Sequence, residues 1–307
     1  MPATPEGPLP NLLLAGFPKT GTTSLFSLLA MHPAIGASKV KETEYFLPAR
    51  YGEQIAPVSE YRGLFAGTEQ ASIRMEATPA YVYGGAPLTA AVESLLGKPK
   101  VLFTVREPIA RLRSYYRAQQ ARLRIPIDMT LGDYVAQCAP VGRDALSDRA
   151  QDPFLGVLGG MYSEFIPEWS RQFDVRVVAF EDLTTNTSGV LSALAKWLEI
   201  DSSPFVGMEL PHENPSVLYR RKQLQRVALA INSSLEPLLR RHPEIKTKAR
   251  AAYYRVNGRP MPKADGDIEA DVLRRFKEAN ATLTGQLREL IVYKLPPWLA
   301  DESLIDE

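Results

Sequence analysis

The stretch NLLLAGFPKTGTTS, which runs from Asn11 to Ser24, decides how this chain folds. It opens with a short apolar run, residues 11–17, that a proline follows, a pattern typical of a buried strand in a parallel sheet. From residue 22 to residue 31 leucines recur at helical spacing, until His32 and Pro33 end the pattern. The stretch therefore predicts a buried strand, a loop that contains glycine, and a helix.

The same alternation continues along the chain. Residues 100–105 and 175–180 are apolar runs that indicate two more buried strands. Helical patterns cover residues 108–123, 162–173, 188–198, 216–241 and 268–290. Strands that alternate with helices predict an α/β fold, a single domain with a central, mainly parallel β-sheet flanked by helices. We place this domain at residues 11–299, between a proline-rich, disordered lead-in at residues 1–10 and an acidic tail at residues 300–307.

The composition excludes several classes of protein. Of the 307 residues, 45% are hydrophobic and 23% charged, as in soluble globular proteins. The 36 Lys and Arg residues barely outnumber the 35 Asp and Glu residues, so we expect no nucleic-acid partner. No apolar run approaches the roughly 18 residues of a membrane helix, and the N-terminus lacks a signal-peptide pattern. We therefore expect a cytoplasmic protein without integral membrane association.

Cysteine and histidine are scarce, which argues against a metal site. The single cysteine, Cys138, excludes an intrachain disulfide and a CxxC motif. The 3 histidines, His32, His212 and His242, are widely separated in the sequence. We expect no metal ligand set in this chain.

The loop between the first strand and the first helix is a candidate anion-binding site. Such a loop directs backbone N–H groups and the positive end of the helix dipole at one point. Gly21 allows close approach of a ligand, Lys19 adds a full charge, and Thr22 and Thr23 add hydroxyl groups. The spacing of Gly16 and Gly21 resembles the start of a Walker A loop, but the lysine precedes the second glycine. A plain strand–turn–helix connection is the alternative.

A second candidate anion-binding site follows the strand at residues 100–105. Arg106 ends that strand and Pro108 opens the next helix, an arrangement in which an arginine can bind a phosphate through two hydrogen bonds. Ser114, on the same helix, could donate another. The further arginines indicate a solvated helix face, of which some members could line an anionic acceptor site; they are Arg111, Arg113, Arg117, Arg122 and Arg124.

These two elements resemble the cofactor-binding elements of sulfotransferases that use 3′-phosphoadenosine 5′-phosphosulfate (PAPS). In that family the first loop reads roughly PKxGTT, and an arginine at a strand end precedes a serine by eight positions. The resemblance implies a P-loop-NTPase-like sulfotransferase fold and assigns the 3′-phosphate of PAPS to Arg106 and Ser114. It assigns the 5′-phosphate and the sulfuryl group to Lys19, Thr20, Gly21, Thr22, Thr23 and Ser24.

Sulfuryl transfer to a hydroxyl also needs a base for the acceptor proton and positive charge at the leaving phosphate oxygen. Lys19 could supply the charge. The segment KETEYF, residues 41–46, resembles the KEPxFF-like segment of the heparan-sulfate branch, in which the Glu is the base. The resemblance therefore implies that Glu42 is the catalytic base, and it implies no requirement for a metal. A solvated turn is the ordinary alternative for such a run.

Two further segments resemble the family more loosely. EATPAY, residues 76–81, resembles EKTPAYF of the same branch, but Ala77 replaces a lysine associated with the sulfated polysaccharide, which weakens a glycosaminoglycan assignment. Glu76 remains a second candidate base, with a buried ion pair to Arg74 as the alternative. Residues 214–222 correspond to a late loop over the cofactor, which implies that Arg220 or Arg221 contacts the 3′-phosphate or the adenine. A helix N-terminus with exposed basic residues is the alternative there.

The sequence thus predicts a PAPS-dependent sulfotransferase that modifies a hydroxyl of a sugar, glycolipid or small natural product and releases PAP. Two alternatives remain open. A P-loop-type small-molecule kinase shares the strand–loop–helix geometry, but its loop would end in GKS or GKT. A non-catalytic anion-binding scaffold of the same fold would keep the cavity without the chemistry.

Overall fold

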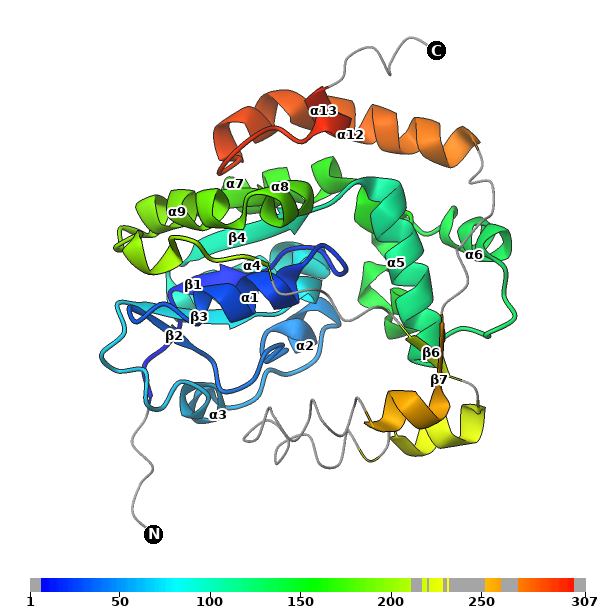
Figure 1. The fold of residues 1–307 in the computed structure, drawn as a ribbon, viewed down its shortest axis with the longest axis horizontal. Helices are drawn as coiled ribbons and strands as arrows, with labels where there is room; N and C mark the ends of the chain where they lie inside the picture. Colours follow the sequence, from blue (N-terminus) through cyan, green and yellow to red (C-terminus); the bar gives the residue numbers. More distant parts are fainter. Residues whose placement is uncertain are drawn as a thin grey trace.

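The centre of the molecule is a five-stranded parallel sheet (Figure 1). The structure is a computed structural model that describes residues 7–210, 217–219, 221–228, 231, 252–260 and 270–300. In their order across the sheet the strands are β2 (Ile35–Ala37), β3 (Ile73–Ala77), β1 (Leu12–Leu14), β4 (Lys100–Val105) and β5 (Val175–Ala179). The expected single α/β domain with a parallel central sheet is confirmed, and β1, β4 and β5 are the three strands that the apolar runs predicted.

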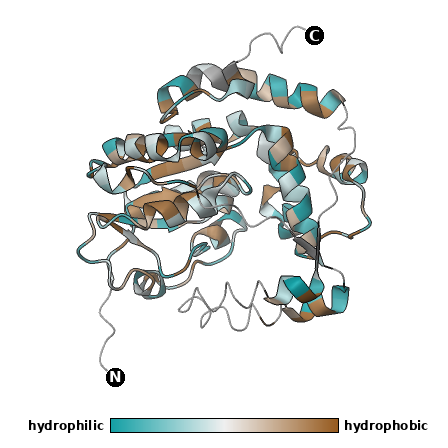
Figure 2. Cartoon of the chain, viewed as in Figure 1, coloured by the Kyte–Doolittle hydropathy of each residue, from teal (hydrophilic) through white to brown (hydrophobic). Residues whose placement is uncertain are grey.

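Helices cover both faces of the sheet (Figure 1). On one face, alternate strand residues such as Leu12 and Leu14 pack with α1 (Thr22–Leu29) and α9 (Thr187–Leu198). On the other, Leu13 and its neighbours pack with α4 (Gly85–Leu96), α5 (Pro108–Ala121) and α12 (Ala270–Leu290). Burial on both faces explains why β1 and β4 are continuously apolar, and Figure 2 shows these central strands among the most hydrophobic parts of the chain.

Shorter elements connect this frame. They are α2 (Leu47–Arg50), α3 (Val58–Gly63), α6 (Leu131–Cys138), α7 (Ile166–Ser170), α8 (Phe180–Thr185), α13 (Pro297–Ala300) and the 3₁₀ helices η1 (Pro79–Gly84), η2 (Arg143–Ser147), η3 (Arg149–Phe154), η4 (Leu158–Gly160), η5 (Tyr162–Glu164) and η6 (Ser203–Phe205). No helix in the described part of the chain is both long and apolar enough to cross a bilayer.

Three sequence expectations need correction. The helix expected over residues 162–173 is divided into η5 and α7, because Pro167 lies in the first turn of a new helix. The helix expected from residue 216 begins instead with a strand, β6 (Val217–Tyr219), which pairs antiparallel with β7 (Gly258–Pro260) beside α5 (Figure 1). Residues 7–10 of the expected lead-in pack against the domain, since Gly7 is buried and its carbonyl accepts a hydrogen bond from Arg62.

Parallel strands bring the segments that follow them to one edge of the sheet. Here that edge receives the segments after β2, β3, β1 and β4, four neighbours in the sheet. Both candidate anion-binding elements and the segment with Glu42 follow one of these strands, and Glu76 lies near the end of β3 itself. The topology therefore predicts that they meet.

Candidate active site

A cavity of about 560 Å³ lies at this edge, within the usual range for small-molecule sites. Its walls come from all four of the converging segments and from η3. The lining residues are Pro18, Lys19, Gly21, Thr22, Thr23, Ser24, Ser27, Glu42, Glu44, Leu47, Arg50, Tyr51, Thr78, Pro79, Ala80, Tyr83, Arg106, Ser114, Tyr115, Ala118, Gln119, Arg122, Arg124, Arg149, Asp152 and Leu155. One cavity thus joins the two anion-binding elements and the expected base.

The loop after β1 presents its backbone to the cavity through two left-handed residues. Gly21, the residue before α1, has φ 86°, and Lys19 has φ 75°. Glycine adopts this conformation without penalty, whereas a non-glycine residue costs of order 1–3 kcal/mol and is held there by its surroundings. The loop places Lys19 at the cavity together with the N-terminus of α1, which is the arrangement that favours an anion.

Thr20 is the one predicted residue of this loop that does not line the cavity. It is fully buried, and its hydroxyl donates to the carbonyl oxygen of Phe17 at 2.5 Å. Because that donation uses its hydrogen, the Thr20 oxygen accepts from the hydroxyl of Thr104, also at 2.5 Å. The Thr20 side chain therefore anchors the loop to β4 and is directed away from the cavity.

Arg106 and Ser114 lie on the neighbouring wall. Arg106 follows β4, and its guanidinium carbon lies 4.4 Å from the centre of the Phe180 ring, where a cation–π interaction is favourable. Glu107 caps α5 by accepting hydrogen bonds from the backbone of Ile109 and Ala110. This cap fixes the start of the helix that carries Ser114 into the same cavity.

Glu42 is a half-buried carboxylate at the cavity. Its backbone has φ 62°, and its Oε1 atom accepts a hydrogen bond from Lys41 Nζ at 2.5 Å. Burial alone would raise the pKa of Glu42, but the positive charges of Lys41, Arg122 and Lys19 outweigh it, so the pKa lies below its ordinary value. Glu42 is therefore ionised at neutral pH and able to accept a proton.

Glu76, the second candidate base, does not line the cavity. It is fully buried on β3, where its Oε2 atom accepts a hydrogen bond from the Thr43 hydroxyl. Burial raises the pKa of Glu76 to about 7, although the Thr43, Tyr81 and Tyr61 hydroxyls that face the carboxyl oppose the shift. Its Oε1 atom has no hydrogen-bond partner among the described residues. The ion pair with Arg74 that the sequence left open is not formed, because that guanidinium donates to carbonyl oxygens of Leu9 and Ala71.

The remaining wall joins segments far apart in sequence. The buried Arg50 donates from Nη2 to Asp152 Oδ1 at 2.8 Å, and Tyr51 donates to the other oxygen of the same carboxylate at 2.9 Å. Arg149 lies 3.8 Å above the Tyr51 ring and pairs with Glu53 at 2.6 Å. Arg50 and Asp152 are 102 positions apart, so no local motif could have indicated this wall.

The arginines in α5 and directly after it differ in position. Arg122 and Arg124 line the cavity, as the sequence allowed for some of this group. Arg111 is fully buried and donates to the Gly156 carbonyl and to the Tyr83 hydroxyl, so it supports the core. Gln119 lines the cavity while fully buried, and neither atom of its amide has a partner among the described residues.

Of the two late-loop arginines, the structure describes Arg221. Arg220 lies outside the described residues. Arg221 is exposed and does not line the cavity, and its backbone N–H donates to Asn257 Oδ1 at 2.8 Å. Within the described ranges no group of three His, Cys, Asp or Glu side chains is arranged to hold a metal ion.

Comparison with known proteins was made for the sequence and for the fold. Residues 9–218 match the family model described as sulfotransferase domain. The chain is 26% identical over 195 residues to human heparan sulfate glucosamine 3-O-sulfotransferase 3B1. The aligned region covers 62% of this chain and 46% of the relative. It is also 26% identical over 207 residues to bifunctional heparan sulfate N-deacetylase/N-sulfotransferase 1 of Caenorhabditis elegans. That aligned region covers 64% of this chain and 23% of the relative. The matches span less than half of either relative.

A solved structure shares the fold over nearly the whole chain. The sulfotransferase from Alicyclobacillus acidocaldarius superposes with a TM-score of 0.62, at 17% identity, and covers 95% of this chain and 99% of its own. At 17% identity, this similarity shows that the two chains share a fold.

Proposed function

This chain belongs to the sulfotransferase domain family, and from that premise we propose that it transfers a sulfuryl group from PAPS to a hydroxyl of an acceptor and releases PAP. The acceptor class that we propose is a sugar, a glycolipid or a small natural product. One observation carries the proposal: Lys19, Arg106 and Glu42 line a single cavity, although they follow three different strands.

The donor side of the cavity is suited to a molecule with two anionic ends. The N-terminus of α1 and Lys19 would bind the 5′-phosphosulfate end, with hydroxyls from Thr22, Thr23 and Ser24. Arg106, with Ser114, would bind the 3′-phosphate. Phe180 supports this division because its ring packs against Arg106 and fills the space beside Gly21.

The chemistry follows from charges already present in the cavity. The acceptor oxygen would attack sulfur as the bond between sulfur and the phosphate oxygen breaks, and PAP would keep the electron pair of that bond. Glu42 would take the acceptor proton, since its lowered pKa keeps it ionised at neutral pH. Lys19 would stabilise the negative charge that develops on the phosphate oxygen.

The acceptor side supports a polar, hydroxyl-bearing substrate. Tyr51, Asp152 and Gln119 supply hydrogen-bonding groups, and Arg122 and Arg124 supply positive charge. Ala77, where the sequence departs from the heparan-sulfate pattern, is fully buried and contributes its carbonyl oxygen to a hydrogen bond from Glu42 N–H at 2.7 Å.

The test measures ligand preference and group transfer together. We expect PAP without Mg²⁺ to raise the Tm, whereas ATP with Mg²⁺ leaves it unchanged. We expect the wild type to transfer labelled sulfate from PAPS to at least one acceptor in a panel of sugars, glycolipids and phenols, and Glu42→Gln to bind PAP without transferring label. Stabilisation by ATP with Mg²⁺ would instead indicate a kinase, and PAP binding without transfer to any acceptor would indicate a binding scaffold.

A further inference from the structure

Hydrogen bonds join the segment that contains Glu42 to the segment that contains Glu76. Between residues 42–46 and 76–81, the backbone N–H of Glu42 donates to the Ala77 carbonyl at 2.7 Å. The N–H of Glu44 donates to the Thr78 hydroxyl at 3.2 Å. Two of the motifs in the sequence therefore form one hydrogen-bonded unit, with Glu42 at its cavity end.

The residues that flank Thr43 have an unfavourable backbone conformation. Glu42 has φ 62° and Glu44 has φ 57°, both in the left-handed region that non-glycine residues rarely adopt. Such a conformation persists only where surrounding contacts determine it. Thr43, the residue between them, is therefore the position at which a side-chain contact can fix both.

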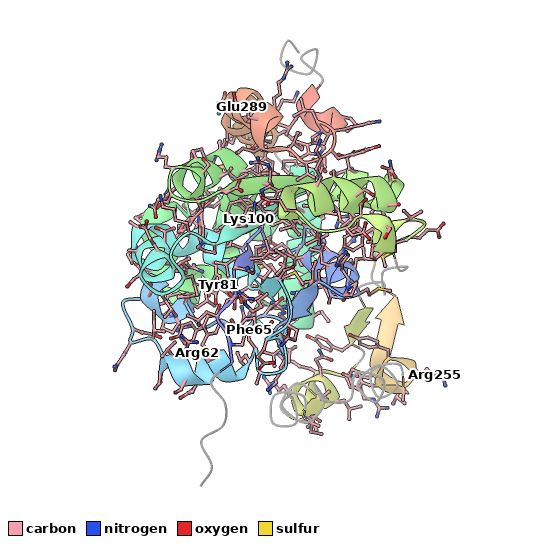
Figure 3. The ribbon with its side chains drawn as sticks, turned by 90° about the vertical axis from the view of Figure 1, so that its left-hand side faces the viewer. Arg62, Phe65, Tyr81, Lys100, Arg255 and Glu289 are labelled. Carbon is pink, nitrogen blue, oxygen red and sulfur yellow. The ribbon has the colours of Figure 1, made fainter. Side chains whose placement is uncertain are left out.

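The hydrogen bonds of Thr43 all run in one direction. Its hydroxyl donates to Glu76 Oε2, so its oxygen is left to accept from the Tyr81 hydroxyl at 3.3 Å. The Tyr81 oxygen in turn accepts from the backbone N–H of Phe46 at 3.1 Å. The donors thus run from Phe46 through Tyr81 and Thr43 to Glu76. Tyr81 and Glu76 are both fully buried, and Figure 3 labels Tyr81 in the interior of the molecule.

Glu76 suits the end of this chain because its Oε2 atom can accept the hydrogen bond of Thr43 whether or not the carboxyl is charged. It is fully buried, and among the described residues no Lys or Arg pairs with it. The groups that face it are the hydroxyls of Thr43, Tyr81 and Tyr61. An uncompensated buried carboxylate is costly, and the contact that it makes is with the loop of the expected base.

We propose that Glu76 is a positioning residue, which holds Glu42 at the cavity by accepting the hydrogen bond of Thr43. The inference rests on the proposed function, because Glu42 matters as the base of that reaction. It assigns Glu76 no proton transfer of its own, since Glu76 does not line the cavity.

Four variants test this role. Thr43→Val removes the hydroxyl with little change of shape, and Thr43→Ser restores it. Glu76→Leu removes the acceptor, and Glu76→Gln keeps an acceptor oxygen without the charge. Thr89→Val is the matched control, because Thr89 is also fully buried but its hydroxyl donates to the carbonyl of Ala86 within α4.

We expect Thr43→Val and Glu76→Leu to lower kcat about tenfold or more, while the KM for PAPS and the stabilisation by PAP change less than about twofold. Thr43→Ser, Glu76→Gln and Thr89→Val should keep most of kcat. Hydrogen exchange of the backbone amides at residues 42–46 should be faster in the first two variants only.

Two results would overturn the inference. Unchanged kcat and unchanged hydrogen exchange in Thr43→Val would show that the Thr43 hydroxyl does not position the loop of Glu42. This variant still tests the inference if Glu76→Leu does not fold. Loss of activity in Glu76→Gln as complete as in Glu42→Gln would show that Glu76 itself takes a proton. If the wild type transfers no sulfate, the proposed function fails, and the exchange measurement still decides whether Glu76 holds the loop.

Discussion

The guanidinium of Arg106 stacks on the ring of Phe180, with 4.4 Å between the guanidinium carbon and the ring centre. The other edge of this ring meets the loop after β1, where a Cβ atom on Gly21 would lie 2.5 Å from the ring. Phe180 follows β5 and therefore packs against both anion-binding elements at once. Under the proposed function, this ring would fix the spacing between the sites for the two anionic ends of the donor.

Gly21→Ala tests this packing. The new methyl would clash with Phe180, and the φ of 86° is unfavourable for alanine, so we expect a loss of about 1–3 kcal/mol in the free energy of unfolding and weak stabilisation by PAP. Gly97→Ala is the control, because Gly97 has φ 70° with no atom within 4 Å of its Cβ position. Urea unfolding and PAP thermal shifts check both. Equal effects of the two substitutions would contradict the role given to the ring.

Lys19→Ala should lower kcat about a hundredfold, because Lys19 lines the cavity and we assign to it the stabilisation of charge on the leaving oxygen. Steady-state kinetics at saturating PAPS measure this loss. Lys39→Ala is the matched control, since Lys39 donates to the Gly63 carbonyl and does not line the cavity. A change confined to the KM for PAPS would assign Lys19 to binding instead of catalysis.

Arg106→Ala should raise the KM for PAPS about tenfold or more and leave kcat within a few-fold, because its charge is assigned to the 3′-phosphate, remote from the reacting atoms. The control is Arg176→Ala, which removes a comparable arginine 5.9 Å from the Trp197 ring and outside the cavity. Isothermal titration with PAP provides the same comparison without turnover. Wild-type affinity in Arg106→Ala would exclude the assignment.

Glu76 should make stability depend on pH. Burial raises the pKa of Glu76 from 4.5 to about 7, so the folded protein binds this proton more tightly than the unfolded chain. The resulting stabilisation is complete below pH 4.5 and is lost as the pH rises to 7. Relative to Glu76→Gln, the wild type should therefore lose about 3 kcal/mol in the free energy of unfolding between pH 4 and pH 8. Denaturant titrations of both proteins measure this difference, and a difference that is constant with pH would refute the assignment.

Gln119→Leu should make the protein more stable and a poorer enzyme. The substitution removes two buried polar atoms that lack partners among the described residues, which is worth about 1 kcal/mol or more. The KM for the acceptor should rise while stabilisation by PAP stays unchanged, since Gln119 lies on the wall beyond Ser114. Gln120→Leu is the control, because the neighbouring amide donates to Tyr116 and to the Ile127 carbonyl, and its loss should destabilise the fold. A destabilised Gln119→Leu would contradict this account.

The sequence predicted the donor side of the site far better than the acceptor side. The strands β1 and β4 are buried on both faces, which makes them continuously apolar, and the loops that follow them carry local motifs. Both properties can be read within a few residues. Lys19, Arg106 and Ser114 were therefore placed correctly in one cavity, although local pattern alone did not show that Thr20 turns inward.

The rest depended on contacts between distant residues. β3 was not expected as a strand because Arg74 and Glu76 interrupt its apolar pattern. Their side chains make contacts with remote partners, the Leu9 carbonyl for Arg74 and the Thr43 hydroxyl for Glu76. The pair of Arg50 with Asp152 is likewise invisible in any short window. Such positions are decided by tertiary contacts, which override local propensity.

The contact of Arg149 with Tyr51 and Glu53 links the two peripheral segments of the acceptor wall to each other, whereas the donor wall is built from the ends of the central strands. A substitution in one of these two segments would therefore disturb the other, so that the proposed acceptor wall would change as a unit. The segments after β1 and β4 take no part in this contact, so a variant with a new acceptor preference should keep the affinity for PAP of the wild type.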